Sequence, residues 1–583
     1  MTEPALSVVA TGLTGEFHAL GVLDWPDLHP ARHLGLLYRE RDERVLLTVA
    51  LAVRALRAGS VCLDLDRVRA GLTGRDDELV EVPDELWPTL PEWLDALAAS
   101  PLVALGPAGD PARPLRLIDH KLYLTRYWQQ EEQVRVTLQQ RATSPSAPPP
   151  RQLDEWLAEL FPGADVDPDQ RRAVAQVATE GVTVLAGGPG TGKTTTIARM
   201  LALLVRQGVR RIALAAPTGK AKTRLEEAVR EAANDLPSDV AASVEQLGAS
   251  TLHRLLGARP NARPAFRHNR DNPLPHDVVI IDELSMVSLT MMARLTDALA
   301  PHTRLVLVGD PDQLSSVDAG AVLSDLTQAA WLGTTSGGPV VRLRRNYRFT
   351  GLLGDLAEAI RAGEAEQVLG LVTAGQPTLT LTSPNHAHDA LRARVVTAGR
   401  AIHAAAVAGD AAQALRLLDG HRLLCAHRHG PFGATTWARR AEQWLRASGA
   451  AIGAEGEWYA GRTVLVTVNQ PDWGIYNGDT GVVLTDTGRA LVHLGGTTRP
   501  LSPELLGPTQ SLDALTVHKA QGSQFDAVTL VLPDVESPLL TRELLYTAVT
   551  RAREAVHVIA TPEALRAAVQ RTARRASGLR DRL

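Results

Sequence analysis

The sequence holds few cysteines, no long apolar run and no excess of basic charge, and each shortage excludes a class of protein. Its two cysteines, Cys62 and Cys425, cannot build a disulfide framework or a cysteine-rich metal cage. A membrane helix needs about 18 or more consecutive apolar residues, and no such run occurs. The first residues lack the basic and then apolar pattern of a secretion signal. We therefore expect a cytoplasmic, globular chain, and 583 residues suffice for several domains.

Lysine is also scarce, because only five of the 61 Lys and Arg side chains are lysine and 56 are arginine. A drift toward arginine replaces solvated charges freely, but it spares sites that need a compact ammonium on a flexible stem. For Lys121, survival by chance stays open. The other four lie in short motifs that predict contacts with nucleotide or nucleic acid, namely Lys193, Lys220, Lys222 and Lys519. Since the net charge is −4, any binding of nucleic acid must be local.

One of these lysines, Lys193, stands in a glycine-rich loop between a predicted strand and a predicted helix. The apolar run 182–186 is typical of a buried strand, and apolar residues at helical spacing follow Lys193. Gly187, Gly192, Lys193 and Thr194 match the G-x-x-x-x-G-K-[ST] phosphate loop, whose backbone N–H groups face phosphates. Lys193 would bind the β- and γ-phosphates of ATP, and Thr194 would hold Mg²⁺. The predicted nucleotide-binding set is Gly188, Pro189, Gly190, Thr191, Gly192, Lys193, Thr194 and Thr195.

Strand and helix patterns alternate after residue 150, which predicts parallel sheets covered by helices. Strands are expected near 182–186, 211–216, 277–282 and 304–309, and again near 422–428, 526–532 and 555–560. The Pro/Ser run at 143–150 is typical of a semi-rigid linker. We therefore divide the chain into a mainly helical domain at 1–142, this linker, and α/β domains at 151–340 and 341–583. Turns and short strand signals at about 460–510 predict a small β-barrel inserted into the last domain.

Reactive side chains follow the predicted strands, at the sheet edge where open parallel sheets bind ligands. Asp282 would hold Mg²⁺, and Glu283 would be the general base that orients the attacking water. Gln313 follows the next strand and could sense the γ-phosphate. Arg348 and Arg551 could reach across a cleft from the second α/β domain and stabilise charge on the transferred phosphoryl group.

Taken together, the motifs of about the last 420 residues resemble those of superfamily 1 helicases. The likeness is strongest to the 5′→3′ branch typified by RecD, the alpha chain of exodeoxyribonuclease V. It rests on the segments 216–220, 250–256, 282–283, 309–313, 346–348, 516–522 and 546–551. The resemblance implies tandem RecA-like motor domains with ATP in the cleft and single-stranded DNA across the top. It also implies an SH3-like form for the inserted barrel.

The resemblance assigns further residues to the nucleotide and to DNA. Gln170 would read the adenine, and Gly522 and Gln524 would lie near the ribose. The family usually has Glu where this chain has Gln524, although an amide can still hydrogen-bond there. His253 and His518 could instead be structural histidines. The implied DNA contacts, which hold the backbone without reading sequence, are Pro217, Thr218, Lys220, Thr251, His253, Thr516, His518 and Lys519.

A basic, turn-rich segment at 257–276 resembles the pin hairpin that related 5′→3′ helicases place at the duplex fork. Its one aromatic residue, Phe266, could stack on a splayed base. A surface loop with one half-buried phenylalanine is an equally good interpretation of the same residues.

In this family the N-terminal region docks on a partner, so the resemblance implies a heterotrimer with RecB-like and RecC-like subunits. Trp25, Trp87, Trp93 and Trp128 predict hydrophobic surface for that contact, since tryptophan is enriched at interfaces; alternatively they fill the domain's own core. No nuclease cluster of carboxylates with lysine occurs, so cleavage would belong to a partner. We expect an ATP-dependent 5′→3′ DNA helicase, the motor of a recombination nuclease. The alternatives are a free-standing RecD-like helicase and a regulatory subunit that binds ATP with little turnover.

Overall fold

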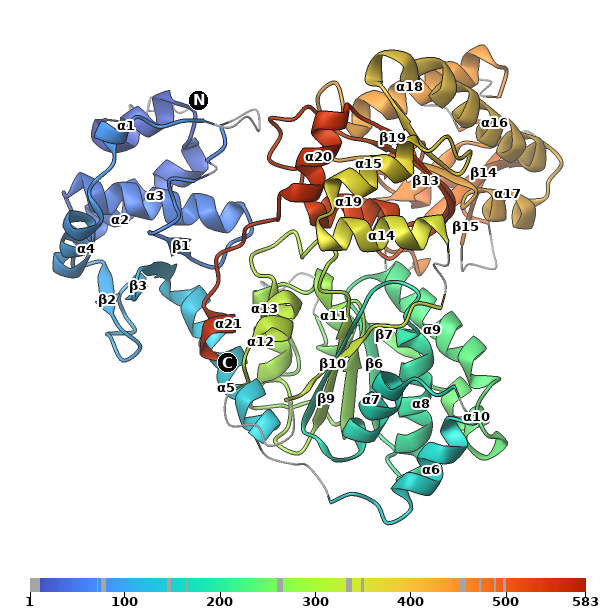
Figure 1. Ribbon diagram of the computed structural model, residues 1–583, viewed down its shortest axis with the longest axis horizontal. Coiled ribbons are helices and arrows are strands. Elements are labelled where there is room, and N and C mark those ends of the chain that lie inside the picture. The colour runs from blue at the N-terminus through green and yellow to red at the C-terminus, as the bar shows by residue number, and fades with distance from the viewer. Residues whose placement is uncertain are drawn as a thin grey trace.

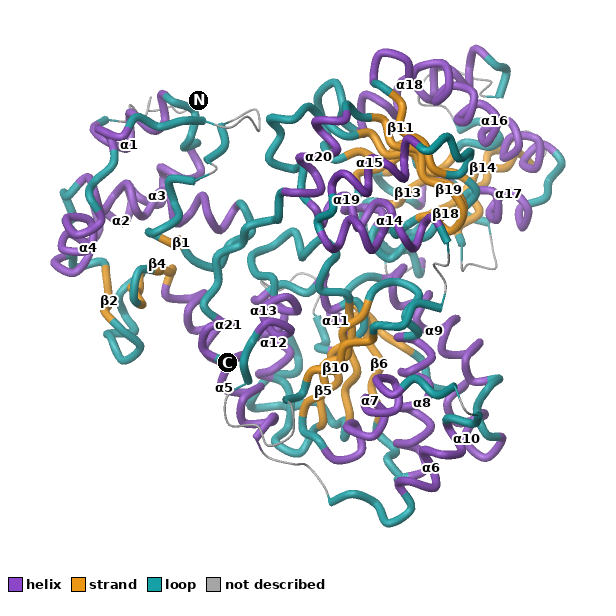
Figure 2. Tube along the Cα trace, viewed as in Figure 1, coloured by secondary structure: helices purple, strands orange, loops and turns teal. Residues whose placement is uncertain are grey.

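The computed structural model describes residues 11–583 apart from 71, 75–79, 144–147, 164, 259–265, 332–337, 348–350, 451–457, 471–472, 487–488 and 496–499. Figure 1 shows an N-terminal unit, in blue, beside two α/β units that lie one above the other. In both α/β units the strands form an inner layer between helices (Figure 2). Along these described stretches, no helix has the length and hydropathy needed to span a membrane.

The first α/β unit is built on a parallel sheet in the order β10-β5-β9-β8-β6-β7. Its strands are rich in β-branched residues, which suit burial on both faces. In β8, Val279 packs into the same core as Met292 of α12, whereas Ile280 packs with Met200 of α8 on the opposite face. The strands are β5 (Val182–Gly187), β6 (Ile212–Ala216), β7 (Ala249–Thr251), β8 (Val278–Ile281), β9 (Arg304–Gly309) and β10 (Val340–Leu343). The helices are α6 (Leu153–Leu160), α7 (Pro168–Thr179), α8 (Lys193–Arg206), α9 (Gly219–Ala233), α10 (Ser238–Glu245), α11 (Leu252–Leu255), α12 (Leu289–Asp297) and α13 (Val322–Gln328).

The second α/β unit repeats this plan with a parallel sheet in the order β11-β19-β18-β12-β17. Its largest core joins the sheet to α14, α15, α19 and α20. The strands are β11 (Leu379–Thr382), β12 (His421–Cys425), β17 (Ala514–Thr516), β18 (Phe525–Val531) and β19 (Ala552–Ile559). The helices are α14 (Leu352–Ala362), α15 (Ala365–Thr373), α16 (Ala387–Val407), α17 (Ala411–Leu417), α18 (Ala434–Ala447), α19 (Arg542–Val549) and α20 (Pro562–Gln570).

An antiparallel sheet interrupts the second α/β unit between α18 and β17. Its strand order is β15-β14-β13-β16, and its small core includes Val466, Ile475 and Val492. Among the described residues β15 and β16 stand at opposite edges, so an open sheet is seen and closure into an SH3-like barrel stays a prediction. The strands are β13 (Thr463–Val466), β14 (Thr480–Asp486), β15 (Arg489–Leu494) and β16 (Thr509–Gln510).

The N-terminal unit combines helices with a small mixed sheet that the sequence did not predict, in the order β1-β4-β3-β2. Trp87 and Trp93 lie in its core, and Trp128 is buried in the core of the first α/β unit. The prediction that the tryptophans provide hydrophobic surface is therefore wrong for three of the four, and only Trp25 is exposed, at 40%. The elements are α1 (Gly12–Ala19), α2 (Trp25–Tyr38), α3 (Glu43–Arg57), α4 (Leu90–Ala99), β1 (Leu63–Asp64), β2 (Val103–Leu105), β3 (Leu115–Ile118) and β4 (Lys121–Leu124).

Helix α5 (Thr125–Thr143) joins the N-terminal unit to the first α/β unit. It packs against α12, and Gln130 accepts a hydrogen bond from the Thr290 hydroxyl at 2.9 Å. Residues 571–583, which we call the C-terminal strap, run from α20 back to α5 and end in α21 (Leu579–Arg582), as Figure 1 shows in red. Leu579 and Leu583 of the strap are buried in the core that α5 and α12 share. The C-terminal strap and α5 are thus held together on the first α/β unit.

Candidate functional site

The predicted phosphate loop lies at the carboxyl end of β5, where the strand gives way to α8. Gly190 and Gly192 have φ of +80° and +81°, values that disfavour other residues. At Gly188 a Cβ atom would lie 2.7 Å from the hydroxyl of Tyr546, which comes from α19 of the second α/β unit. The ammonium of Lys193 donates to the carbonyl oxygens of Gly187 and Gly188, at 2.7 and 2.8 Å. The loop is therefore closed around its own lysine.

Two segments close over this loop from the side. The Gln170 amide donates to the Thr191 carbonyl at 3.3 Å, and its oxygen accepts from Arg199 at 2.8 Å. The Tyr347 N–H donates to the Gly190 carbonyl at 2.8 Å, and the Asn346 amide donates to the Pro189 carbonyl at 3.3 Å. The sequence predicted Gln170 at this place but not the contacts of residues 346 and 347. Arg348, which follows them, lies outside the described residues.

Three carboxylates gather at the ends of the neighbouring strands β8 and β9. Burial raises the pKa of Asp282 to about 6, and the charge of Glu283 adds to this, whereas Lys193 opposes it. Burial likewise raises the pKa of Asp310 to about 6. Such carboxylates are costly without a cation beside them, so the cluster suits a site where positive charge binds.

Glu283 has φ +53°, the left-handed conformation that non-glycine residues rarely adopt. Strain of this kind persists where the surrounding structure enforces it, often at functional sites. It turns the chain out of the strand direction at the second residue after β8, which is the position predicted for the general base.

Gln313 is buried at the end of β9, and its amide donates to a carboxylate oxygen of Asp310 at 2.9 Å. The next residue, Leu314, already contacts the second α/β unit through the Thr547 hydroxyl, at 2.8 Å. The predicted sensor therefore stands at the junction of the two units.

From the second α/β unit, Arg551 reaches the same place. It is 2% exposed, and burial lowers its pKa, whereas the charges of Glu283 and Asp310 raise it. Its guanidinium is held by the carbonyl oxygens of Thr547 and Ser523, at 3.1 and 3.3 Å. The structure thus brings together Lys193, Asp282, Glu283, Gln313 and Arg551, which were predicted from four separate motifs.

One charged side chain at this junction was missed from the sequence. Arg224 lies on α9; burial lowers its pKa, and the charges of Glu283 and Asp282 oppose that. Its spacing from Lys220 is one helical turn, so the two cations share a face of α9. That spacing was the available signal, but in a chain with 56 arginines it did not stand out.

Glycine at 522 also lies at this junction. It has φ +72°, and a Cβ atom there would lie 3.7 Å from Ala221 of α9. Gln524, two residues on, is half-buried. Gly522 is therefore close to the first α/β unit, while contact of Gly522 and Gln524 with a ribose stays a prediction.

The hydroxyl groups predicted to contact DNA already have roles in the chain. Thr218 caps α9 by accepting from the Ala221 N–H at 3.2 Å, and Thr251 caps α11 by accepting from the Arg254 N–H at 3.3 Å. Thr516 accepts from the Lys519 N–H at 3.4 Å. Capping leaves the hydroxyls of Thr218 and Thr251 at helix starts, where N–H groups also favour phosphate. Of the remaining predicted contacts, Pro217, Lys220 and His518 are half-buried, whereas His253 and Lys519 are exposed.

Burial shifts the pKa values of the basic groups in this set. It lowers the pKa of Lys220 to about 8 and lowers those of His253 and His518 below the usual range. Lys220 therefore stays mainly protonated at neutral pH, whereas the two histidines are neutral. Neutral imidazoles can donate one hydrogen bond to a phosphate but add no charge.

Phe266 lies where the predicted pin begins to return toward the sheet. It pairs with Ala258 in an antiparallel bridge, and its ring centroid lies 6.1 Å from that of His253. It is partly buried against the core of the first α/β unit. Residues 259–265, which would form the tip, lie outside the described residues, so the pin stays a prediction.

Comparison with known proteins assigns these features to one family. Three family models match: the N-terminal domain of RecBCD enzyme subunit RecD at residues 19–123, an AAA domain at 170–319, and a UvrD-like helicase C-terminal domain at 511–559. The chain is 48% identical over 595 residues to RecBCD enzyme subunit RecD of Mycobacterium tuberculosis, which covers 100% of this chain and 99% of that protein. It is 34% identical over 408 residues to the ATP-dependent RecD2 DNA helicase of Deinococcus radiodurans, covering 69% of this chain and 50% of that protein.

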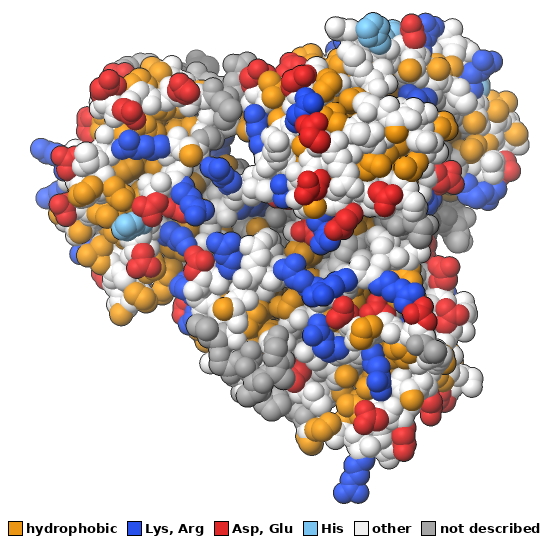
Figure 3. All heavy atoms as spheres, viewed as in Figure 1, with side chains coloured by type: hydrophobic (Ala, Val, Ile, Leu, Met, Phe, Trp, Pro, Cys, Tyr) orange, Lys and Arg blue, Asp and Glu red, His pale blue; other side chains and the backbone are white. Residues whose placement is uncertain are grey.

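The chain belongs to the RecD family. It is accordingly a DNA helicase motor subunit that binds nucleotide through its AAA domain, the region that holds the phosphate loop, Asp282, Glu283 and Gln313. On the face of this RecD-family chain shown in Figure 3, Lys and Arg side chains gather where the two α/β units meet.

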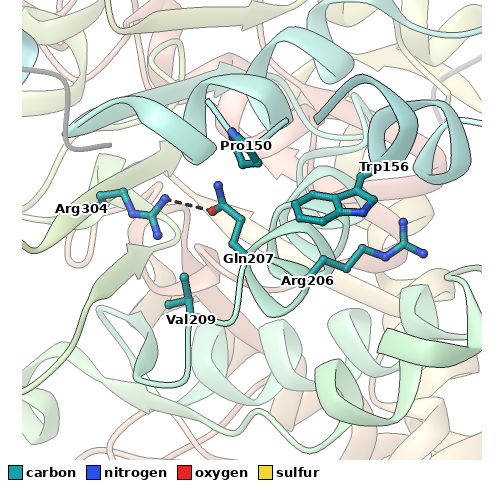
Figure 4. Close-up of a pocket in the computed structure, with 6 residues that line it drawn as sticks. All are labelled: Pro150, Trp156, Arg206, Gln207, Val209 and Arg304. Atoms are coloured by element: carbon teal, nitrogen blue, oxygen red, sulfur yellow. Dashed lines mark hydrogen bonds between the residues drawn. The ribbon is translucent and has the colours of Figure 1, made fainter. Parts of the chain in front are cut away.

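A separate cavity of about 280 Å³ lies away from these motifs (Figure 4). It opens near the start of β9, the opposite end of the strand from the phosphate loop, and Arg304 there donates to Gln207 at 3.1 Å. Ligands of open parallel sheets bind at the carboxyl edge instead. The cavity therefore lies at the opposite edge of the sheet from the phosphate loop of this RecD-family chain, and it is lined by Pro150, Trp156, Arg206, Gln207, Val209 and Arg304.

Proposed function

We propose that this chain is an ATP-dependent 5′→3′ DNA helicase and the motor subunit of a RecBCD-type complex that processes DNA ends in the cytoplasm. The observation that supports this most is the convergence of Lys193, Glu283 and Gln313 with Arg551 across the junction of two parallel sheets. Such a junction can open and close with the state of a nucleotide bound between the units.

The residues at this junction fit ATP with Mg²⁺. Gly188 leaves no room for a side chain, and the backbone around Lys193 is curled as phosphates require. The Thr194 hydroxyl and the Asp282 carboxylate are hard oxygen ligands of the kind that Mg²⁺ prefers. When bound, the ion would neutralise negative charge that develops on the phosphate oxygens. Gln170 would bind the adenine, and Gly522 and Gln524 would face the ribose.

The chain's own groups would then carry out hydrolysis. A carboxylate oxygen of Glu283 would accept a hydrogen bond from the attacking water and take its proton. Gln313 would turn its amide from Asp310 toward the γ-phosphate. Arg551, and Arg348 from the neighbouring segment, would stabilise the transferred phosphoryl charge. DNA-stimulated ATP hydrolysis by the purified chain tests this reading, and turnover that DNA does not change would favour a regulatory ATP-binding subunit instead.

Polarity follows from the family branch. A partial duplex with a 5′ single-stranded tail should be unwound and one with only a 3′ tail should not, so preferential unwinding of the 3′-tailed duplex would contradict the proposal.

If Phe266 belongs to a strand-separating pin, Phe266→Ala should slow unwinding while ATP hydrolysis stimulated by single strands is kept. Equal loss of both activities would indicate a folding role for Phe266.

The proposed partners are RecB-like and RecC-like subunits, with nuclease activity in a partner and not in this chain. Figure 3 shows hydrophobic side chains on the N-terminal unit, and Leu36 and Leu37 of α2 are 72% and 66% exposed. Surface of this kind marks sites of association. Leu36→Asp with Leu37→Asp should lose copurification with the partner subunits but keep DNA-stimulated ATP hydrolysis. Val407→Asp is the matched control, because Val407 is 64% exposed on the second α/β unit. Assembly of the double variant would place the docking surface elsewhere.

A further inference from the structure

The peptide groups of Leu314 are held from two sides by the second α/β unit. The Leu314 N–H donates to the Thr547 hydroxyl, and its carbonyl accepts from the Gln521 amide, both at 2.8 Å. Thr547 is fully buried and Gln521 is 7% exposed, so water cannot replace either partner easily. A buried donor or acceptor that loses its partner bears the full cost of desolvation. Leu314 is therefore a firm point of attachment between the two units.

Thr547 and Gln521 each connect Leu314 to a different part of the site. The carbonyl of Thr547 accepts from Arg551 at 3.1 Å, so one residue joins Leu314 to the arginine. Gln521 stands between Lys519, a predicted DNA contact, and Gly522, which packs near Ala221 of α9. On the other side, Leu314 directly follows Gln313, which is bonded to Asp310. The attachment at Leu314 therefore lies between the predicted nucleotide sensor and both of the segments that face nucleotide and DNA.

We propose that Thr547 and Gln521 are positioning residues that couple the state of Gln313 to the second α/β unit through the backbone of Leu314. This rests on the proposed helicase function. Because Gln313 and Leu314 share a peptide bond, a backbone shift that accompanies the move of Gln313 from Asp310 to a phosphate would turn the Leu314 N–H. Thr547 transmits that movement to Arg551, and Gln521 transmits it to the segment 516–522. Because both bonds are buried, the movement is passed on instead of being absorbed by exchange with water.

The hydroxyl of Thr547 can be removed with little change of shape. Thr547→Val should lower kcat for DNA-stimulated ATP hydrolysis by about tenfold, the effect of one buried hydrogen bond lost from the reacting arrangement. The KM for ATP should change little, because the phosphate loop is untouched. Thr547→Ser restores a hydroxyl and should recover most of the turnover. A purely structural role for Thr547 would not produce this split between kcat and KM together with rescue by serine.

The role of the Gln521 amide is tested by variants that remove its hydrogen-bond donor but keep the size of the side chain. Gln521→Met keeps the length without a donor, and Gln521→Glu places a carboxylate against the Leu314 carbonyl. Both should lower the number of base pairs unwound per ATP hydrolysed. Thr529→Val is the control, since the Thr529 hydroxyl is buried in β18 and bonds His421 at 2.9 Å within the second α/β unit. It should leave kcat and the coupling ratio as in the parent chain.

The outcomes separate this proposal from the proposed function. Thr547→Val with parental kcat, or Thr547→Ser as impaired as valine, would overturn the role of Thr547. Equal losses in Thr529→Val would show a general effect of removing a buried hydroxyl and would also overturn it. A parental coupling ratio in both Gln521 variants would overturn the role of Gln521. A parent chain without DNA-stimulated turnover would instead contradict the proposed function, and the coupling role would fall with it.

Discussion

The nucleotide junction and the clasp, by which we mean the hydrogen bonds that join Glu131 of α5 to the C-terminal strap, are assembled in opposite ways. At the junction, a run of seven residues from Gly187 to Lys193 forms the whole phosphate loop through its own backbone. At the clasp, the fully buried carboxylate of Glu131 accepts from the hydroxyl and N–H groups of Ser577 and Gly578, which lie 446 and 447 residues further along the chain. Arg582 and Tyr123 complete its partners.

The difference shows why function was easier to predict than architecture. Phosphate binding needs particular residue types at fixed spacing, and these remain visible in a sequence. A buried carboxylate needs hydrogen-bond donors, but these can come from any part of the sequence. The clasp also links the strap, which extends from the second α/β unit, to the N-terminal unit. No sequence pattern in either segment indicates that the two will be in contact.

The largest effect is expected at the phosphate loop. Lys193→Arg keeps the charge, but a guanidinium does not fit where one ammonium reaches two carbonyl oxygens, so kcat should fall by about a thousandfold or more. Lys121→Arg is the control, because Lys121 lies on β4 of the N-terminal unit and pairs with Asp581 of the strap. It should change kcat little in a DNA-stimulated ATPase assay. Near-normal turnover of Lys193→Arg would contradict the site and the argument from scarce lysine.

A somewhat smaller loss, with a different signature, is expected at Glu283. Glu283→Gln removes the proton acceptor but not the phosphate loop, so kcat should fall by about a hundredfold or more while nucleotide binding is kept. Binding of a fluorescent ADP analogue, measured beside ATP turnover, separates the two. If the variant no longer binds nucleotide, the strained residue is structural.

The central strands of both parallel sheets were predicted from the sequence, and all four edge strands were missed. Central strands such as β8 are continuous apolar runs, because helices cover both faces. The edge strands β7, β10, β11 and β17 are as short as β8 or shorter, but each carries partly exposed side chains, whereas β8 is wholly buried. Short strands of this kind lack an apolar pattern that distinguishes them from loops.

At the candidate site, Lys193, Asp282, Glu283, Gln313 and Arg551 were predicted and the structure brings them together. The contacts of Asn346 and Tyr347 with the phosphate loop were not, because they are made through backbone carbonyls that have no residue signature. The tryptophan prediction failed for a related reason. Composition cannot tell a buried tryptophan such as Trp93 from one at an interface.

At the clasp, Glu131→Gln should raise the opening rate of the strap. The amide of the variant has one acceptor oxygen in place of two, so Ser577 and Gly578 cannot both keep their hydrogen bonds to it, and a buried donor without a partner costs about 1–3 kcal/mol. Hydrogen exchange at the Gly578 amide, which donates to Glu131, reports this opening directly. Glu132→Gln is the matched control, since Glu132 pairs with the same Arg582 at 2.7 Å but is 28% exposed. Equal exchange in both variants would mean that burial of Glu131 does not matter to the strap.

The smallest effect concerns the pH dependence of the same strap. Burial raises the pKa of Asp325, on α13, to about 7, while its hydrogen bond with Ser577 of the strap opposes that shift. A raised carboxyl pKa means that the closed state binds a proton more tightly, so stability should fall as pH rises from about 4 to 7, by about 1 kcal/mol after discounting for partial exposure. Asp325→Asn should remove this pH dependence of hydrogen exchange at the Gly578 amide.

Asp581 should change the stability of the strap with pH in the opposite direction. Although burial opposes it, the hydrogen bond to Lys121 lowers the pKa of Asp581, so the stabilisation by Asp581 is lost as pH falls. Asp581→Asn should therefore weaken the strap at neutral pH, and a strap whose opening has the same pH slope in both variants would show that neither carboxyl controls it.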